Sequence, residues 1–169
     1  VFAKSSSKLK IPDLEYVMSP ASFKEGTVGL LDKVSGMTLG VWQTRPKSNG
    51  YVKINSKNMH EPPIINPNYL SDPYDVDVLL KSIKIGRNLL STSPLQPYLN
   101  GKTNPSNDLQ TDDELLSWAR NEGITVYHMI GTAKMGPKSD KLAVVNNKLQ
   151  VRASVADSVD VVLSFVEIV

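Results

Sequence analysis

A strong turn signal separates two segments of β-like sequence in the first third of the chain. Residues 37–44 (MTLGVWQT) and 51–54 (YVKI) are rich in the β-branched and aromatic side chains that favour strands. The polar segment between them ends in Asn49-Gly50, and both residue types tolerate the positive φ angles of a tight hairpin turn. The spacing therefore predicts an antiparallel hairpin, and Trp42 is its expected core anchor.

Two further segments carry helical patterns. In the first, Asp72 can cap the helix, Pro73 suits the first helical position, and apolar residues recur at helical spacing up to residue 90. The second begins with the capping-box sequence TDDE (residues 111–114), and Gly123 is a plausible stop. Further β-like segments lie at residues 14–18, 124–127, 143–151 and 159–169, the third of them as a hairpin. The mixture predicts an α+β fold, an antiparallel sheet with helices packed on it.

Composition excludes several classes of function. The 169 residues suit one domain, or a domain and part of another. The net charge is only +2, and no basic patch with interleaved aromatic residues occurs, so we expect no nucleic-acid binding. The absence of cysteine excludes disulfides, thiol catalysis and zinc–thiolate sites and fits a cytoplasmic protein. No apolar run approaches the roughly 18 residues of a membrane span.

The segment GTAKMGPKS, residues 131–139, is close to a phosphate-binding loop but does not match it. Pro137 interrupts the pattern before Lys138 and removes a backbone N–H where that loop needs donors. The chain also contains no G-x-G-x-x-G, so it supplies no dinucleotide-binding turn of its own.

The two histidines differ in context. His60 lies in a polar turn, where we expect an exposed side chain without a special role, and the distance in sequence between the histidines argues against a metal site. His128 follows the predicted strand at residues 124–127 and precedes Gly131, Thr132 and another small residue. A histidine at the end of a strand is more often packed structurally than catalytic. Its imidazole is nevertheless suited to proton transfer, so the residues alone leave both roles open.

Four stretches in a fixed order point to a family. They are RPKSNGYV (residues 45–52), PIINPNYL (63–70), HMIGTAKMGP (128–137) and AVV (143–145). Together they resemble the C-terminal part of a glucose–methanol–choline (GMC) flavoprotein oxidoreductase, of the choline-dehydrogenase-like or alcohol-dehydrogenase-like type.

The resemblance implies an FAD-dependent enzyme that oxidises the CH–OH group of an alcohol to an aldehyde or ketone, with hydride passing to the flavin. It implies that His128 is the general base, that Tyr127, Gly131 and Thr132 shape a flavin-facing turn, and that Asp157 is a further flavin contact. It also implies two parts: a substrate-binding domain at residues 1–123, and a segment at residues 124–169 that carries the signature histidine and joins the FAD-binding domain.

The chain departs from the family pattern in two ways. The glycine fingerprint of the FAD-binding fold is missing, and no His or Asn follows Asn147, where the family has a second catalytic residue. We therefore expect a fragment that does not retain FAD and is inactive alone. Its expected partners are a small-molecule alcohol and the FAD-binding portion of a parent protein. The alternative is a non-catalytic binding or interaction domain derived from the same fold.

Overall fold

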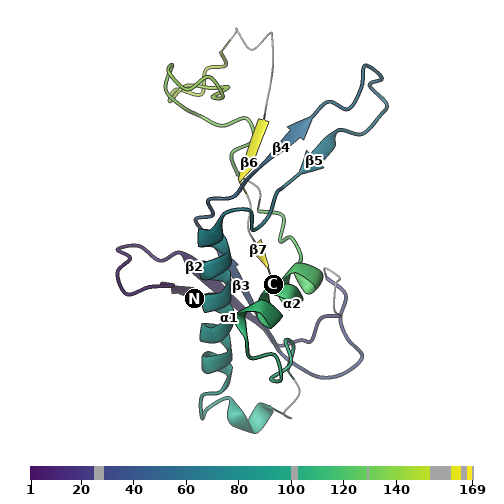
Figure 1. Cartoon of the computed structure of the whole chain (residues 1–169), viewed down its shortest axis with the longest axis vertical. Helices are drawn as coiled ribbons and strands as arrows, with labels where there is room; N and C mark the ends of the chain where they lie inside the picture. Colours follow the sequence, from purple (N-terminus) through teal and green to yellow (C-terminus); the bar gives the residue numbers. More distant parts are fainter. Residues whose placement is uncertain (25–28, 100–102, 129, 153–160, 165–166, 169) are drawn as a thin grey trace. The chain divides into compact units, whose positions relative to one another are not determined.

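The chain divides into two compact units, each built around an antiparallel sheet. The computed structural model describes residues 1–24, 29–99, 103–128, 130–152, 161–164 and 167–168 (Figure 1). Unit 1 comprises Val1–Arg45, Pro73–Val126 and Val166–Val169, and unit 2 comprises Pro46–Asp72 and Tyr127–Phe165. Antiparallel strands with two α-helices confirm the predicted α+β class. The functional boundary between residues 123 and 124 stays a prediction.

The sheet of unit 1 has the strand order β1-β2-β3-β7. Its strands are β1 (Phe2–Ala3), β2 (Leu14–Ser19), β3 (Thr38–Gln43) and β7 (Glu167–Ile168). In β2, Leu14 and Tyr16 are buried and Val17 is exposed, as alternation of side chains along a strand predicts, but Met18 at the end of the strand is also exposed. Tyr16 lies opposite Val41 of β3, so the inward side chains of both strands form one apolar face.

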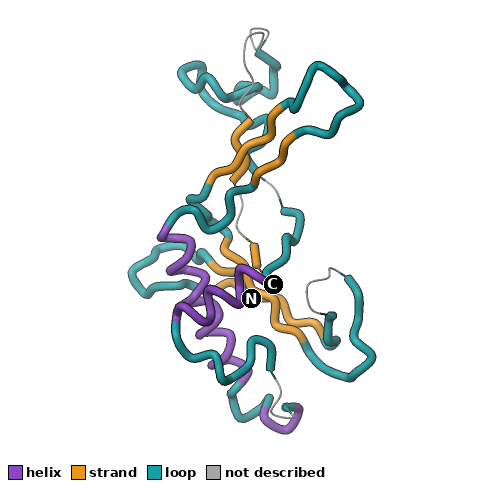
Figure 2. The backbone as a smooth tube through the Cα atoms, turned by 45° about the vertical axis from the view of Figure 1, so that its right-hand side comes forward, coloured by secondary structure: helices purple, strands orange, loops and turns teal. Residues whose placement is uncertain are grey.

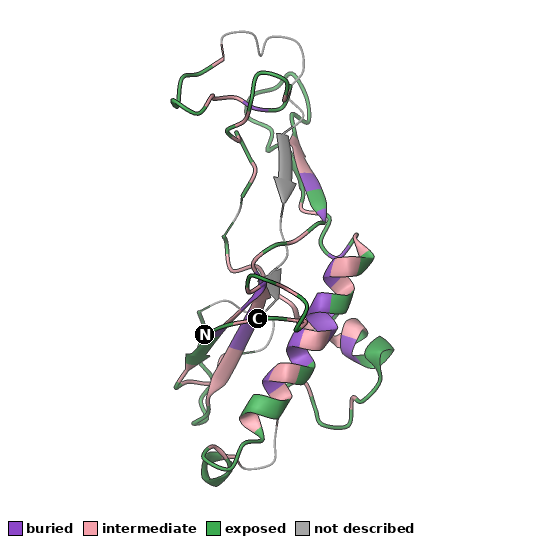
Figure 3. Cartoon of the chain, turned by 90° about the vertical axis from the view of Figure 1, so that its left-hand side faces the viewer, coloured by how far each residue is buried: buried purple, intermediate pink, exposed green. Residues whose placement is uncertain are grey.

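The helix α1 (Pro73–Leu90) covers this apolar face and ends where the sequence predicts. Figure 3 marks the buried positions along α1, among which Val78 joins the cluster of Leu14 and Tyr16. The Tyr16 hydroxyl donates a 2.9 Å hydrogen bond to the Ser82 carbonyl, which satisfies a polar group inside the core.

The second helix, α2 (Asp112–Glu122), has the predicted capping box. The Thr111 hydroxyl accepts from the Glu114 backbone N–H, and the Glu114 carboxylate accepts from the Thr111 backbone N–H at 2.9 Å. Gly123 forms the C-cap, as predicted, and Leu115 is fully buried. The connection from α1 contains the short 3-10 helix η1 (Gln96–Tyr98).

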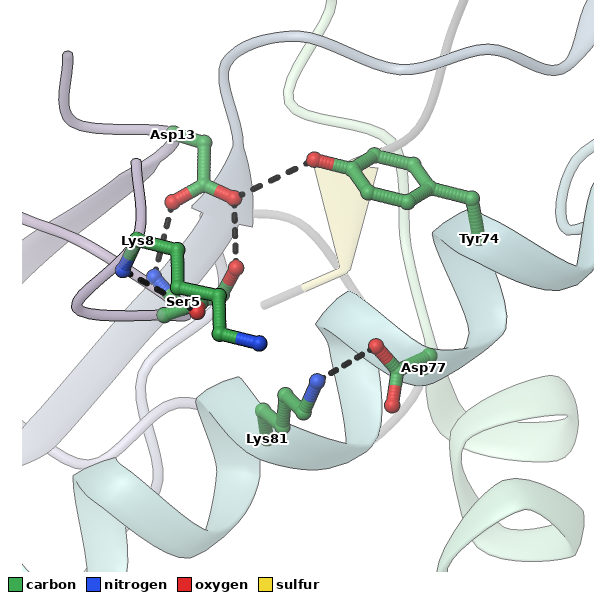
Figure 4. Close-up of polar contacts among 7 residues, drawn as sticks. Ser5, Lys8, Asp13, Tyr74, Asp77 and Lys81 are labelled. Carbon is green, nitrogen blue, oxygen red and sulfur yellow. Dashed lines mark hydrogen bonds and ion pairs between the residues drawn. The ribbon is translucent and has the colours of Figure 1, made fainter. Parts of the chain in front are cut away.

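Polar contacts fix the beginning of unit 1 to its sheet. Asp13 is buried, and its carboxylate accepts hydrogen bonds from the Ser5 backbone N–H at 2.8 Å and the Ser5 hydroxyl at 2.6 Å (Figure 4). The Tyr74 hydroxyl of α1 lies 3.5 Å from the same carboxylate. Burial raises the pKa of Tyr74, and the negative charge of Asp13 adds to the shift.

Trp42 is not the core anchor that the sequence suggests. Its side chain is only partly buried and donates through the indole N–H to Glu15 at 3.1 Å. Val41, its neighbour, is the buried hydrophobic residue of β3. Because successive side chains of a strand face opposite sides, burial of Val41 places Trp42 on the other face, where an indole N–H finds a polar partner.

The sheet of unit 2 has the order β5-β4-β6, and Figure 2 shows its three strands side by side. They are β4 (Asn49–Lys53), β5 (Ile64–Asn66) and β6 (Val161–Ser164). Both pairings are antiparallel. β6 and β7 lie within residues 159–169, which confirms the predicted β character of that segment for its described positions.

The predicted hairpin across Asn49-Gly50 is wrong. The two segments do form strands, but β3 pairs with β2 and β7, and β4 pairs with β5 and β6. Asn49 and Gly50 are the first residues of β4 rather than a turn. A Cβ atom at Gly50 would lie 2.1 Å from the Asn66 carbonyl oxygen, so the glycine serves a close approach of two backbones.

The predicted strand at residues 124–127 does not form either. These residues have no strand assignment, and Tyr127 has a φ of 63°. A left-handed residue turns the chain out of the extended conformation that a ladder requires, which ends the β-like run before His128. In the described parts of the chain, no helix is both long and apolar enough to cross a membrane.

Candidate functional site

The residues predicted to act together lie on one short segment of unit 2. We call residues 127–137 the signature segment. The side chains of Tyr127, His128 and Thr132 are exposed, and Gly131 is partly exposed. The structure therefore keeps four of the five predicted site residues on one accessible stretch of backbone. The fifth, Asp157, lies outside the described residues.

The backbone of the signature segment is bent by residues with left-handed conformations. The φ angles are 63° at Tyr127, 88° at Gly131 and 54° at Ala133. Glycine adopts this region freely, whereas a residue with a Cβ adopts it at a cost of about 1–2 kcal/mol. Such residues persist only where surrounding contacts hold them, and they cluster at functional sites. The bend is therefore a feature that the rest of unit 2 must support.

The second half of the signature segment runs beside residues 144–145. Met135 forms a parallel bridge with Val145, the Gly136 N–H donates to the Val145 carbonyl at 3.1 Å, and the Val144 N–H donates to the Lys134 carbonyl at 2.9 Å. Two turns at residues 137–143 connect the paired stretches, with 3.0 Å and 3.2 Å backbone hydrogen bonds. Pairing thus fixes the end of the segment through main-chain atoms.

The predicted hairpin at residues 143–151 forms in a reduced version. Val145 and Val151 make one antiparallel bridge, and the Asn146 N–H donates to the Gln150 carbonyl at 3.1 Å. The Asn146 side chain fills the loop, since its carbonyl oxygen accepts from the backbone N–H groups of Lys148 and Gln150. Side-chain bonds thus replace part of a regular ladder here.

Charged side chains add a second set of contacts. The Lys134 ammonium lies 2.8 Å from the Asp140 carboxylate, which also accepts from the Leu142 N–H at 3.0 Å. These two contacts, with the positive charge of Arg152, lower the pKa of Asp140. The Arg152 guanidinium donates to the Gly136 carbonyl at 2.7 Å. These residues carry no recognisable sequence signal, because ion pairs between loop positions follow no periodic pattern.

The candidate site offers an exposed imidazole side chain. No group of three or more His, Asp or Glu side chains that could hold a metal ion occurs in the part of the chain that the structure describes. An exposed imidazole at position 128 can accept a proton from a hydroxyl group that approaches from solvent. Thr132 and Ala133 are exposed and small, whereas Ile130 and Met135, which flank them in the same segment, are exposed and larger.

Comparisons with known proteins identify the family to which the segment belongs. A family model described as GMC oxidoreductase matches residues 46–155, which include most of unit 2 and the whole signature segment. The "oxygen-dependent choline dehydrogenase" of Staphylococcus aureus strains JH9 and Newman is 34% identical over 146 residues. That match covers 86% of this chain and 25% of the relative, so the chain spans about a quarter of the length of these relatives.

A solved structure, pyridoxine 4-oxidase from Mesorbium loti, has a similar fold. Its TM-score is 0.69 at 21% sequence identity, over 89% of this chain and 29% of the oxidase. The likeness supports the α+β architecture, and the family match covers the residues that carry the signature. The chain belongs to the GMC oxidoreductase family.

Proposed function

We propose that the chain forms the substrate-side portion of an FAD-dependent oxidoreductase that converts the CH–OH group of an alcohol to a carbonyl. Residues 1–123 contribute to substrate binding, and residues 124–169 bring the signature histidine to the reacting centre. The observation that carries the proposal is that a chain of this family presents His128 exposed on the bent signature segment.

His128 acts as the general base in this proposal. Its imidazole accepts the hydroxyl proton of the alcohol and becomes an imidazolium. Loss of that proton raises the electron density at the carbinol carbon, which makes departure of the C–H hydrogen as hydride easier. A positioned base of this kind typically contributes a factor of about 10² to 10⁴ in rate.

FAD, when bound, supplies the acceptor for the hydride. Gly131, Thr132 and Ala133 fit the flat part of such a group, because these three consecutive positions carry only small side chains. Tyr127, Gly131 and Thr132 would lie against it, and Asp157 is a further proposed contact. We expect the 169 residues alone not to retain FAD, since no G-x-G-x-x-G turn occurs in them.

The names of similar proteins suggest probes for the substrate. Choline appears in the name of the Staphylococcus aureus relatives, and pyridoxine appears in that of the structural neighbour. Both molecules carry a primary alcohol, so they are suitable first compounds for a test of alcohol oxidation.

The test compares variants of the two histidines in the full-length, FAD-loaded protein. Reduction of the flavin by choline, pyridoxine or another alcohol is followed by absorbance in rapid mixing. His128→Ala should slow this reduction by about 100-fold or more, with unchanged flavin content, because the base is lost. His60→Ala is the matched control, since His60 is exposed in a loop of the same unit and has no proposed role.

Equal reduction rates in His128→Ala and the wild type would refute the base. If no alcohol reduces the flavin of the wild-type protein, the result favours the alternative, a non-catalytic binding or interaction domain that retains the fold.

A further inference from the structure

Unit 2 holds the signature segment with little apolar burial. Among the side chains that the structure describes in this unit, the buried hydrophobic ones are Leu70 and Ala143. Tyr127 and Met135 of the signature segment are exposed at 64% and 52%. Among the described side chains of unit 2, polar contacts are therefore the ones that bear on the left-handed bend of this segment.

Lys134 and Asp140 form the first of these contacts. Their side chains are 37% and 28% exposed, and the N–O distance is 2.8 Å. The two oxygens of the carboxylate are used differently, since Oδ2 faces the Lys134 ammonium and Oδ1 accepts from the Leu142 N–H. One side chain thus ties the signature segment to the turn that follows it.

Gly136 and Arg152 form the second contact. A Cβ atom at Gly136 would lie 2.9 Å from the Cβ atom of Ala143 and 3.1 Å from Oδ2 of Asp140, so the segment crosses the following turn at close range. The Arg152 guanidinium binds the carbonyl of the same glycine, while the Arg152 backbone N–H donates to the Val144 carbonyl at 3.0 Å. Both contacts therefore lie close to Gly136, since Arg152 binds its carbonyl and Oδ2 of Asp140 lies beside the position of its missing Cβ atom.

We propose that Lys134, Asp140 and Arg152 are positioning residues that hold the signature segment in its bent conformation and thereby orient His128. We call these three residues the clasp. The inference rests on the proposed function of His128 as a base, and it assigns to the clasp no contact with substrate or flavin.

The clasp acts on the chain at a short distance from the base. Lys134 follows Ala133, whose φ of 54° is one of the left-handed angles of the bend, and only five residues separate Lys134 from His128. Release of Lys134 lets Ala133 relax toward ordinary backbone angles, which turns the peptides that precede it. A displacement of about 1 Å at a reacting group is enough for a loss of about 10²-fold in rate.

The test uses Asp140→Ala and Asp140→Asn in the full-length, FAD-loaded protein. Alanine removes the contact with Lys134 and the acceptor for the Leu142 N–H, whereas asparagine retains an acceptor and loses only the charge. Asp77→Ala is the matched control, because Asp77 also forms an ion pair with a lysine, at 2.6 Å on α1 of unit 1 (Figure 4).

Two readouts are measured for each variant. Hydrogen exchange of the amides at residues 131–136 reports the conformation of the segment without any activity. Flavin reduction is measured over a range of alcohol concentrations. A lower maximal rate at an unchanged half-maximal concentration indicates a misplaced base rather than weaker alcohol binding. We expect Asp140→Ala to exchange at least fivefold faster and to reduce flavin about tenfold more slowly at an unchanged half-maximal concentration. Asp140→Asn should lie between it and the wild type, and Asp77→Ala should match the wild type.

The possible results separate failure of the clasp from failure of the proposed function. Unchanged exchange in Asp140→Ala overturns the clasp, whatever the rates are. Faster exchange with an unchanged flavin-reduction rate, in a protein that His128→Ala inactivates, overturns the positioning role and leaves the proposed function intact. If His128→Ala reacts like the wild type, the proposed function has failed and the role of orienting a base fails with it. Exchange then still shows whether the clasp holds the segment.

Discussion

The close approach of β4 and β5 at Gly50 leads to a quantitative prediction. A Cβ atom there would lie 2.1 Å from the Asn66 carbonyl oxygen and 2.5 Å from the Pro67 carbonyl oxygen. Gly86, in the C-terminal part of α1, has the opposite surroundings, since its nearest contacts would be side-chain atoms of Leu39 at 3.5 Å and Tyr16 at 3.6 Å. The same substitution, glycine to alanine, should therefore have opposite effects at the two positions.

The size of each effect follows from these distances. An ordinary C–O contact is about 3.3 Å, so Gly50→Ala must move β5 by about 1.2 Å and lengthen ladder hydrogen bonds of about 2.9 Å beyond 4 Å. Loss of two to three such bonds, at about 1 kcal/mol each, weakens the β4–β5 pairing by about 3 kcal/mol. Gly86→Ala fits without displacement and gains about 1 kcal/mol, because alanine is the better helix former.

Hydrogen exchange resolved by peptide measures both effects in the same protein. A loss of about 3 kcal/mol corresponds to exchange on the order of 100-fold faster for the amides of residues 51–53. A gain of about 1 kcal/mol corresponds to exchange about fivefold slower for the α1 amides that open locally around Gly86. Each variant is the control for the other, because each should leave the opposite element unchanged.

The reasoning is refuted if Gly50→Ala leaves the exchange of residues 51–53 within about twofold of the wild type. That result would mean that β5 can move without loss of pairing. Faster exchange of α1 in Gly86→Ala would show that the contacts with Leu39 and Tyr16 are too tight for a methyl group.

Four further perturbations, two substitutions and two changes of pH, probe single contacts. Thr111→Ala removes the N-cap of α2, which typically costs about 1 kcal/mol, and should speed exchange in α2 about fivefold. Backbone and side-chain hydrogen bonds with Thr111 lower the pKa of Glu114. The stability that the ionised carboxylate adds is therefore present above pH 4.5 and is lost as pH falls through the lower pKa of the folded state. Hydrogen exchange of the α2 amides, measured at decreasing pH, checks this loss. Burial raises the pKa of Tyr16 to about 12. The contribution of the neutral hydroxyl to folding stability is therefore full below pH 10 and is lost as pH rises through about 12. Tyrosinate absorbance should appear together with unfolding of unit 1. Gly136→Ala pushes a methyl group to 2.9 Å from the Cβ of Ala143 and should speed exchange at residues 134–145, whereas unchanged exchange would contradict the close packing.

The helices could be predicted because their signals are local. The capping box at Thr111 and the start of α1 at Pro73 depend on residues within one turn, and the structure has both helices at the expected places. The burial of Leu79 and Ile83 also follows from the helical period of 3.6 residues. Secondary structure that is determined by near neighbours in sequence needs no knowledge of the fold.

The pairing around Asn49-Gly50 could not be predicted from near neighbours in sequence. Asn49-Gly50 is compatible with a turn and equally with a strand that needs a residue without a Cβ atom. The choice depends on Asn66, which lies 16 residues further along the chain and approaches Gly50 only in the folded sheet. A local sequence signal was thus correct about the need for glycine and wrong about the reason for it.

The candidate site also contains residues with a local sequence signal and residues without one. His128, Gly131 and Thr132 could be found because the family signature places them at fixed spacing on one short segment. The clasp could not, because its contacts join Lys134 to Asp140 and Gly136 to Arg152 through turns with no repeating pattern. Spacing in sequence can propose residues that meet a substrate, whereas the contacts proposed to orient them depend on the path of the folded chain. If that division is correct, replacement of a clasp residue should alter the rate of the proposed reaction without altering which alcohol is oxidised.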